Sequence, residues 1–464
     1  MEKFERKLAW EALKGHERDK VFGFVEEYKD FLDKAKTERE VVDYVVEAAV
    51  KNGFKSIGEA ERLEPGDRVY MVYKDKMVIL AVIGRRGEEQ GIRLVASHGD
   101  APRLDPKPIP VMEDPDANVS LLQTGWYGAV VRYQWVNIPL ALHGVVVLKD
   151  GRKVDVRIGE DGGPVLLIPD LLPHLSRKRL QDRKARQAVK GEELKIVLSN
   201  IPLEEEKEKF KAAVLKMLKD KYGISEEDLL SADLEVVPAL KAMDVGLDGS
   251  MVAGYGQDDR VSVFTSLRAI LDVDMPEYTC LMWVVDKEEI GSETNTSAQS
   301  LFLHDFLTRI ISLRRGEFRE DYLRRCFVNS KAISADVDTV IHPMHKDLYD
   351  KANAGRMGCG IIVSKVGSMA GKYRGAEAHA EYMAWIRRIL DENNVPWQPG
   401  LLVSKADEEL GGGGTIAVFI ARLGMDVVDA GCGVMGMHSP YELTSKVDVY
   451  SCYLAYRTFY TAEE

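Results

Sequence analysis

Short apolar runs of strand length alternate along this chain with segments of helical periodicity. The strand-like runs include RVYMVY (68–73), MVILAVIG (77–84) and GIRLVASHGD (91–100), which are rich in Val, Ile and Leu. Residues 22–32 and 41–49 instead repeat apolar side chains at three- and four-residue spacing, which predicts two helices. The alternation resumes from about residue 246. This pattern predicts an α/β fold in which a mixed sheet is flanked by helices.

The stretch from about residue 102 to residue 238 differs in texture from the rest of the chain. It is rich in proline and aromatic residues and contains the basic run SRKRLQDRKARQAVK (176–190). At 464 residues, the chain also exceeds the usual size of a single domain. We therefore expect residues 1–103 and 246–464 to form one domain, and residues 104–245 to form an inserted β-rich domain.

Charge and composition exclude several classes of function. The net charge of -12 repels polyanions, so nucleic acid is not an expected partner. No stretch has the length and hydrophobicity of a membrane span, and the first twenty residues lack the apolar core of a signal peptide. Five cysteines are scattered without paired spacing, which is typical of reduced residues rather than of a disulfide framework. We expect a soluble cytoplasmic protein.

Acidic and histidine residues follow directly after several of the apolar runs. In open α/β sheets, ligands bind beyond the carboxyl ends of the strands. His98 ends one such run, and Asp100 lies two residues further on. Asp258 and Asp259 precede a segment of helical pattern. Taken singly, the histidine could be structural and the aspartates could be helix caps.

The segment LMWVVDKEEIGS (281–292) is the most informative. A strongly apolar run ends there in the adjacent carboxylates Glu288 and Glu289. Such a pair can bind a metal through one member, while its neighbour removes a proton from water. A solvated acidic turn is the ordinary alternative. Asp336 follows another strand-like run, and His438 follows a glycine-rich one.

Together these residues form a set of nitrogen and oxygen ligands without a thiolate. Such a set suits zinc first, with cobalt or manganese as alternatives. Two divalent metal ions held close together can polarise a carbonyl and activate water. The set is therefore compatible with a hydrolytic site that holds two divalent metal ions per subunit.

The order and context of these motifs resemble the aspartyl aminopeptidase / aminopeptidase I family of two-metal metallopeptidases. The family's H-T-D-S-P appears as His98-Gly-Asp100-Ala-Pro102, its L-D-N as Gln257-Asp258-Asp259, and its E-E-V-G-S as Glu288-Glu289-Ile-Gly-Ser292. Ser-Ala-Asp336 and Met437-His438-Ser439 match in the same order, so the resemblance spans almost the whole chain.

This resemblance implies an aminopeptidase that removes single residues from the N-termini of peptides. Its metal ligands would be divided between two ions, with His98 and Asp336 on one, Glu289 and His438 on the other, and Asp258 bridging them. Glu288 would be the general base, and Asp100 would orient His98.

The resemblance also has implications for assembly and substrate choice. It implies that the insert mediates dimerisation, that the chain assembles as a dodecamer, and that His174 from the insert reaches a neighbouring active site. Relatives favour acidic or apolar N-terminal residues. An acidic one would need a cation, for which Lys365 and Lys107 are candidates. The residues after the Glu pair and the segment AKTEREVVDY depart from the family pattern, so the preference stays open.

Rival interpretations remain. A related two-metal hydrolase, such as a deblocking aminopeptidase or a carboxypeptidase-like deacylase, would differ in whether it requires a free α-amine. A non-catalytic assembly shell would keep the fold without the chemistry, but the base and the expected ligands are all present. The basic run 176–190 could form a nucleic-acid patch, but it lacks interleaved aromatic residues, and we expect a solvated loop there instead.

Overall fold

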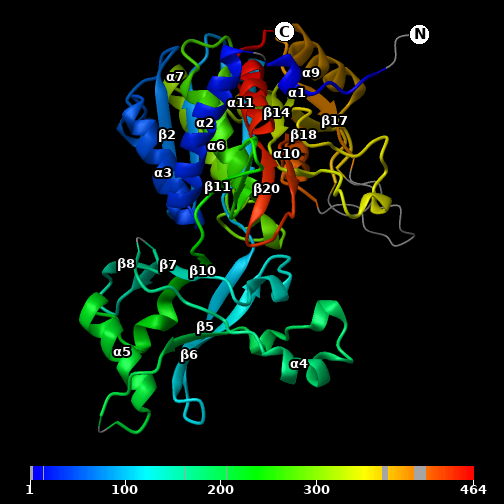
Figure 1. Ribbon diagram of the computed structural model, residues 1–464. Coiled ribbons are helices and arrows are strands. Elements are labelled where there is room, and N and C mark those ends of the chain that lie inside the picture. Colours follow the sequence, from blue (N-terminus) through cyan, green and yellow to red (C-terminus); the bar gives the residue numbers. More distant parts are fainter. Residues whose placement is uncertain are drawn as a thin grey trace. The chain divides into compact units, whose positions relative to one another are not determined.

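The computed structural model describes residues 4–13, 15–160, 162–204, 206–367, 375–401 and 414–463 (Figure 1). The chain forms two compact units. Unit 1 comprises residues 1–100, 242–437 and 442–464, and unit 2 comprises residues 101–241 with the short segment 438–441.

Unit 1 is built on a nine-stranded mixed sheet with the order β1-β2-β3-β13-β4-β14-β18-β16-β17. Its centre is parallel, because β4 pairs in parallel with both β13 and β14, and β14 pairs in parallel with β18. The strands are β1 (Lys55–Ser56), β2 (Arg68–Tyr73), β3 (Met77–Val82), β4 (Ile92–His98), β13 (Thr279–Val285), β14 (Lys331–Ser334), β16 (Ile361–Ser364), β17 (Trp397–Pro399) and β18 (Asp426–Gly431).

Alternate side chains of the central strands enter two separate hydrophobic cores. In β3, Val78 and Leu80 belong to one core, whereas Ile79 and Ala81 belong to the other. This period of two means that both faces of the sheet are covered, as a mostly parallel sheet requires. The first face carries α2 (His16–Lys34), α3 (Glu38–Lys51), α6 (Gln257–Leu271), α9 (Ala380–Glu392) and α11 (Lys446–Thr461). The second carries α7 (Phe302–Arg315), α8 (Glu320–Val328) and α10 (Ala417–Arg422).

The N-terminal helices have local signals that explain where they begin and what they cover. Thr37 and Glu40 form a capping box that starts α3, because each side chain accepts a hydrogen bond from the other's backbone N–H. In α2, Phe24 and Phe31 pack their rings on Phe264 of α6. The short helix α1 (Ala9–Ala12) packs against α11.

A smaller sheet of five strands completes unit 1. Its order is β11-β12-β20-β19-β15. The strands are β11 (Met243–Val245), β12 (Met251–Gly254), β15 (Asp338–Thr339), β19 (Gly433–Met435) and β20 (Glu442–Ser445). Strand β12 leads directly into the start of α6, and β15 follows closely after β14, so this sheet lies beside the carboxyl ends of the central strands.

Unit 2 is built on a six-stranded antiparallel sheet with the order β8-β7-β10-β5-β6-β9. The register of β5 shifts between Pro106 and Val111, where three prolines lack the N–H that a regular ladder needs. The strands are β5 (Arg103–Asp114), β6 (Val119–Tyr127), β7 (Leu140–Val147), β8 (Lys153–Ile158), β9 (Lys195–Ser199) and β10 (Ala232–Pro238). The helices are α4 (Pro173–Leu180) and α5 (Lys209–Tyr222).

The predicted fold class, a mixed sheet flanked by helices, is confirmed, and so are the two N-terminal helices. All five cysteines are free and buried, as expected. The basic run 176–190 differs from the expected loop, because its first residues are helical in α4. That helix buries none of its residues, so its basic side chains are exposed. Over the described residues, every helix is too short or too polar to cross a bilayer.

Candidate metal centre

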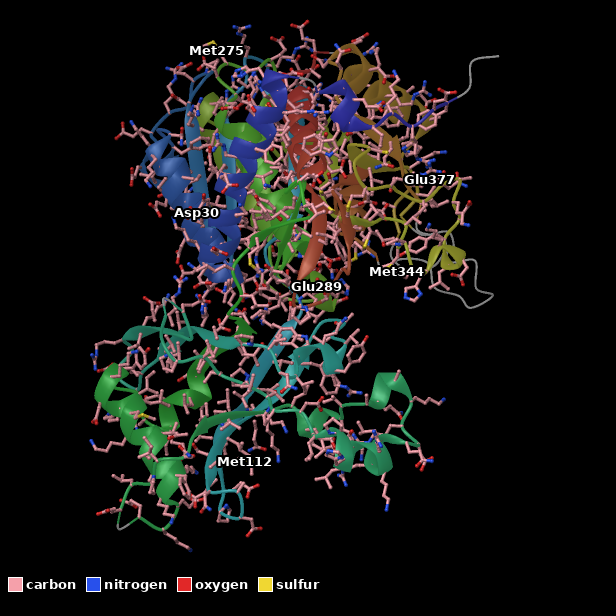
Figure 2. All side chains as sticks on the ribbon, viewed as in Figure 1. Asp30, Met112, Met275, Glu289, Met344 and Glu377 are labelled. Carbon is pink, nitrogen blue, oxygen red and sulfur yellow. The ribbon has the colours of Figure 1, made fainter. Side chains whose placement is uncertain are left out.

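The parallel centre of the large sheet brings three of the predicted motifs to one edge. His98 is the last residue of β4, and it pairs with Val285 at the end of β13. On the other side of β4, Ala96 pairs with Ser334 at the end of β14. Since parallel strands end at the same edge, the Glu288–Glu289 turn and Asp336 both emerge beside His98. Figure 2 shows the Glu289 side chain at this edge of unit 1.

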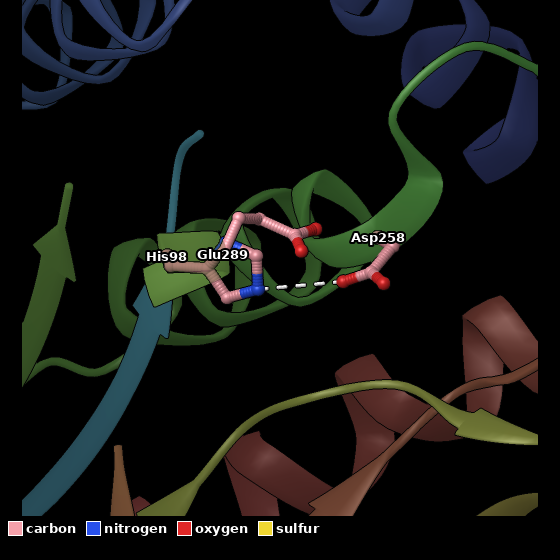
Figure 3. A group of neighbouring side chains, drawn as sticks. All are labelled: His98, Asp258 and Glu289. Carbon is pink, nitrogen blue, oxygen red and sulfur yellow. Dashed lines mark ion pairs between the residues drawn. The ribbon is translucent and has the colours of Figure 1, made fainter. Parts of the chain in front are cut away.

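His98 is buried and surrounded by carboxylates. Its Nε2 lies 3.3 Å from Asp258 Oδ1 and 3.9 Å from Glu288 Oε2. Figure 3 shows this Nε2 directed at Asp258, with Glu289 beside the ring. The other ring nitrogen, Nδ1, lies 3.0 Å from the backbone carbonyl oxygen of Asp100 and 3.4 Å from its carboxylate. Nδ1 therefore has acceptors on Asp100, which leaves Nε2 directed at the other carboxylates.

Asp258 and Asp259 stand at the start of α6 in non-helical conformations, joined by a cis peptide bond. Asp258 N donates a hydrogen bond to Glu442 Oε2 at 3.1 Å. Asp259 Oδ2 accepts one from His98 N at 3.3 Å. The two side chains are both buried, so the pair is part of the site rather than a solvent-exposed helix cap.

Asp100 holds the turn that carries the two glutamates. One of its carboxylate oxygens accepts a hydrogen bond from Glu288 N and the other accepts one from Glu289 N, both at 3.2 Å. Asp100 is fully buried, and a carboxylate bound to backbone N–H groups makes strong hydrogen bonds. Its carboxylate thus contacts both the histidine and the glutamate turn, whereas the sequence predicts contact with His98 alone.

Asp336 sits where the chain approaches itself closely. A Cβ built on Gly431, at the end of β18, would lie 1.9 Å from the backbone oxygen of Asp336. Only glycine fits at that distance, so Gly431 lets β18 pass directly beside the Asp336 backbone. This packing fixes where Asp336 leaves the edge of the sheet.

Burial and the closeness of several carboxylates shift the pKa values of the residues in this cluster. Burial raises the pKa of Asp336 well above its usual value, and the charges of Glu288, Asp258 and Asp429 raise it further. The pKa of Asp259 is also raised well above its usual value, by burial and by Asp336. Burial lowers the pKa of His98, but the carboxylates of Asp100 and Asp258 outweigh it and hold that pKa well above its usual value.

This donor set fits a divalent metal ion. His98, Asp258 and Glu289 offer ligand atoms that all lie within 4.8 Å of one another, and so do His98, Asp259 and Asp336. Imidazole nitrogen and carboxylate oxygen are ordinary zinc ligands. A bound cation would also offset the carboxylate repulsion that raises the pKa of Asp336 and Asp259.

Other predicted site residues are not members of these two ligand groups. His438 has a left-handed backbone (φ 65) and belongs to the short segment assigned to unit 2. His174 is an exposed residue of α4 in unit 2. Lys365 follows β16 in unit 1, and its Nζ lies 3.4 Å from Glu377 Oε1. Their functional roles stay predictions.

Sequence reasoning missed Asp259 and Glu442 as members of the site. From the sequence alone, Asp259 has no role beyond its place next to Asp258. The adjacent acidic pair before an apolar helix is the sequence signal that could have indicated a role for both residues. Glu442 is buried at the start of β20, and its carboxylate binds the backbone of Asp258 across 184 residues of chain. A contact over that separation has no local sequence signal.

The chain is similar to known metallopeptidases over almost its whole length. The family described as aminopeptidase I zinc metalloprotease (M18) matches residues 31–460. A probable M18 family aminopeptidase 1 from Borreliella afzelii is 42% identical over 455 residues, which cover 97% of this chain and 98% of the relative. The crystal structure of an M18 aminopeptidase from Thermotoga maritima superposes with a TM-score of 0.93 at 39% identity, covering 98% of this chain and 99% of that one.

A more distant structure shares the fold alone. It is the mApe1 dodecamer from S. cerevisiae, which is 21% identical with a TM-score of 0.76 and covers 96% of this chain and 97% of that one.

The repulsion within the cluster yields a stability prediction. Asp336→Asn should raise the free energy of unfolding of the metal-free protein by about 1 kcal/mol, because it removes a buried charge held for function. The same change should weaken zinc binding. Urea unfolding of chelator-treated protein and a zinc competition titration measure the two effects. Asp347→Asn, at an exposed position, is the control and should change neither. A metal-free Asp336→Asn protein less stable than wild type would contradict the electrostatic account.

Proposed function

This chain belongs to the aminopeptidase I (M18) family of zinc metalloproteases and is a metal-dependent aminopeptidase. On that basis we propose that it binds two divalent metal ions and uses Glu288 as its general base. The observation that carries this proposal is the convergence of His98, Asp258 and Glu289 within 4.8 Å, with Glu288 on the same turn. Zinc is the first choice of metal, and cobalt or manganese are alternatives.

The proposed ligands divide between the two ions. His98 and Asp336 would hold one, Glu289 and His438 would hold the other, and Asp258 would bridge them. Asp259 shares the second ligand group with His98 and Asp336, so it is either a further ligand or a hydrogen-bond acceptor that fixes His98. When bound, the two ions would polarise the scissile carbonyl and lower the pKa of water.

We infer that Glu288 moves the proton. Its Oε2 lies 3.9 Å from His98 Nε2, so its carboxylate faces the proposed ligands. Its backbone N–H is held by Asp100. In the proposed reaction Glu288 accepts a proton from the attacking water and then delivers it to the leaving amine. A nearby carboxylate or a metal ion would hold the free α-amine of the substrate, which restricts cleavage to the end of the chain.

The substrate's N-terminal side chain is proposed to be acidic or apolar. Lys365 is the candidate cation for an acidic one, because its ammonium is half-exposed in unit 1 with Glu377 as its ion-pair partner. An acidic substrate would replace Glu377 as that partner. Lys107 is the weaker candidate, since it lies in unit 2 on the proline-rich part of β5.

We also propose a homo-oligomer that works in the cytoplasm on peptide substrates. The S. cerevisiae structure is a dodecamer, and unit 2 would supply the dimer contact here. Leu172, the N-cap of α4, and Leu175 within it are both exposed beside His174, and the helix buries none of its own residues, which suits a helix covered by another subunit. His174 would then reach a neighbouring active site. Free, buried cysteines are consistent with a reducing compartment.

The alternative is a related two-metal hydrolase that removes blocked N-terminal residues or acyl groups. The carboxylate-rich site would serve its chemistry equally well. The two functions differ in whether the substrate must carry a free α-amine.

The role of Glu288 predicts a specific kinetic defect. Glu288→Gln should lower kcat at least about 100-fold, because the amide cannot accept a proton, while the protein keeps its zinc. Stopped assays of amine release and metal analysis of the same sample measure both quantities. Glu293→Gln makes the same chemical change at an exposed position of the same loop and should leave kcat unaltered. Near-normal turnover by Glu288→Gln would remove Glu288 from the mechanism.

A substrate panel tests the function itself. We expect metal-dependent cleavage of p-nitroanilides of Asp, Glu, Leu and Lys only when their α-amine is free, with N-acetylated versions left intact. If Lys365 recognises acidic side chains, Lys365→Ala should raise KM for the Asp and Glu substrates and not for the Leu substrate. Cleavage of the acetylated versions at comparable rates would favour the deblocking enzyme.

A further inference from the structure

The turn that carries Glu288 and Glu289 begins with a residue in an unusual conformation. Lys287, between strand β13 and the glutamate pair, has φ 64 and ψ 23. This left-handed region disfavours a residue with a side chain and is normally occupied by glycine. A lysine at this position therefore carries a cost in conformational free energy, which the surrounding structure must offset.

The side chain of Lys287 lies in a cluster of four ionisable residues, of which the two acids are buried and the two lysines are partly buried. Lys287 Nζ lies 3.7 Å from Glu38 Oε1 and 3.6 Å from Asp286 Oδ1. Lys76 Nζ lies 2.9 Å from the same oxygen of Glu38. Glu38 is only 1% exposed and Lys287 only 16% exposed, so solvent screens these interactions weakly.

The four residues come from three separate parts of unit 1. Glu38 is the first residue of α3, Lys76 lies in the connection between β2 and β3, and Asp286 and Lys287 follow β13. Asp286 is itself fixed, because Thr296 Oγ1 donates to its carboxylate at 2.9 Å and Lys287 N donates to it at 2.8 Å. The cluster therefore ties the start of the glutamate turn to a helix end and to a neighbouring strand connection.

The same turn is held at its other side by Asp100, which accepts from the backbone N–H groups of Glu288 and Glu289. Within the turn, Ser292 N donates to Lys287 O at 2.8 Å and Gly291 N donates to Glu288 O at 2.7 Å. Removing the Lys287 contact would leave the turn supported by Asp100 and by its own hydrogen bonds. Small displacements at a catalytic carboxylate are costly to rate.

We propose that Lys287 is a positioning residue, whose ammonium, bound to Glu38, fixes the turn that aims Glu288 and Glu289 into the metal centre. This inference rests on the proposed function in that it takes Glu288 as the base and Glu289 as a ligand. According to this proposal, the reaction rate also depends on Glu38, although its helix, α3, contributes none of the proposed metal ligands. Lys287 and Glu38 act through the turn and not on the substrate.

Three substitutions at one position separate the possible roles of Lys287. Lys287→Met removes the charge and keeps most of the length, Lys287→Arg keeps the charge, and Lys287→Gly relieves the left-handed backbone. We expect Met and Gly to lower kcat about tenfold with KM within about twofold of wild type, and Arg to restore most of the rate. A fully active Lys287→Gly would show that only the backbone conformation matters and would overturn the proposal.

A double-mutant cycle tests the link to Glu38. Glu38→Gln should lower kcat at least as much as Lys287→Met does, because it also removes the Glu38–Lys76 pair. The double variant should lose less than the sum of the two single losses, because each single change already removes the Lys287–Glu38 contact. Additive losses would overturn the proposed pair. Lys51→Met, which breaks an exposed pair with Glu47 on the same helix, is the matched control and should have no effect. Thermal unfolding of each variant confirms that the compared proteins are folded.

A binding measurement separates this inference from the assignment of Glu288. Zinc affinity, measured by competition with a chromophoric chelator, should fall several-fold in Lys287→Met, because Glu289 lies on the same turn. If Glu288→Gln is active while Lys287→Met binds zinc weakly, the base assignment fails and the positioning role stands. If Glu288→Gln is inactive while Lys287→Met and Glu38→Gln match wild type in kcat and zinc affinity, the positioning role alone is wrong.

Discussion

The crowding of buried carboxylates around His98 is the constraint on which the rest of unit 1 depends. Four acidic side chains, those of Asp258, Asp259, Glu289 and Asp336, lie in the two groups that share this one imidazole. Burial and mutual repulsion raise the pKa of Asp259 and Asp336 well above the usual value. A fold tolerates such a cluster only when the surrounding packing holds the carboxylates together. A bound divalent cation would offset their repulsion.

The sheet enforces that crowding. Parallel strands β13, β4 and β14 end at one edge, so the acidic segments that follow them have no room to separate. Gly431 allows β18 to pass against the Asp336 backbone, and Asp100 accepts hydrogen bonds from the backbone of the glutamate turn. Glu442 holds the backbone of Asp258 from the small sheet. The carboxylates of Asp100 and Glu442 are both buried, so little water competes for the hydrogen bonds that they accept.

Much of this arrangement could be predicted from the sequence, because its elements have local signals. Apolar runs of strand length predict the central sheet, and three residues at or shortly after their ends, His98, Glu289 and Asp336, belong to the candidate ligand groups in the structure. The supports of the site could not be found in this way. Glu442 and Glu38 act on the site across long separations in sequence, and nothing near either residue in the chain indicates its target. Lys287 followed a predicted strand, but its left-handed backbone became visible only in the structure.

The most direct test of the two-metal account is an anomalous diffraction experiment on crystals of the zinc-loaded protein, with data collected on both sides of the zinc absorption edge. The account predicts two zinc peaks per chain that share Asp258, one of them bound by His98 and Asp336 and the other by Glu289 and His438. A single peak at this cluster, or zinc bound only at other residues, would contradict it.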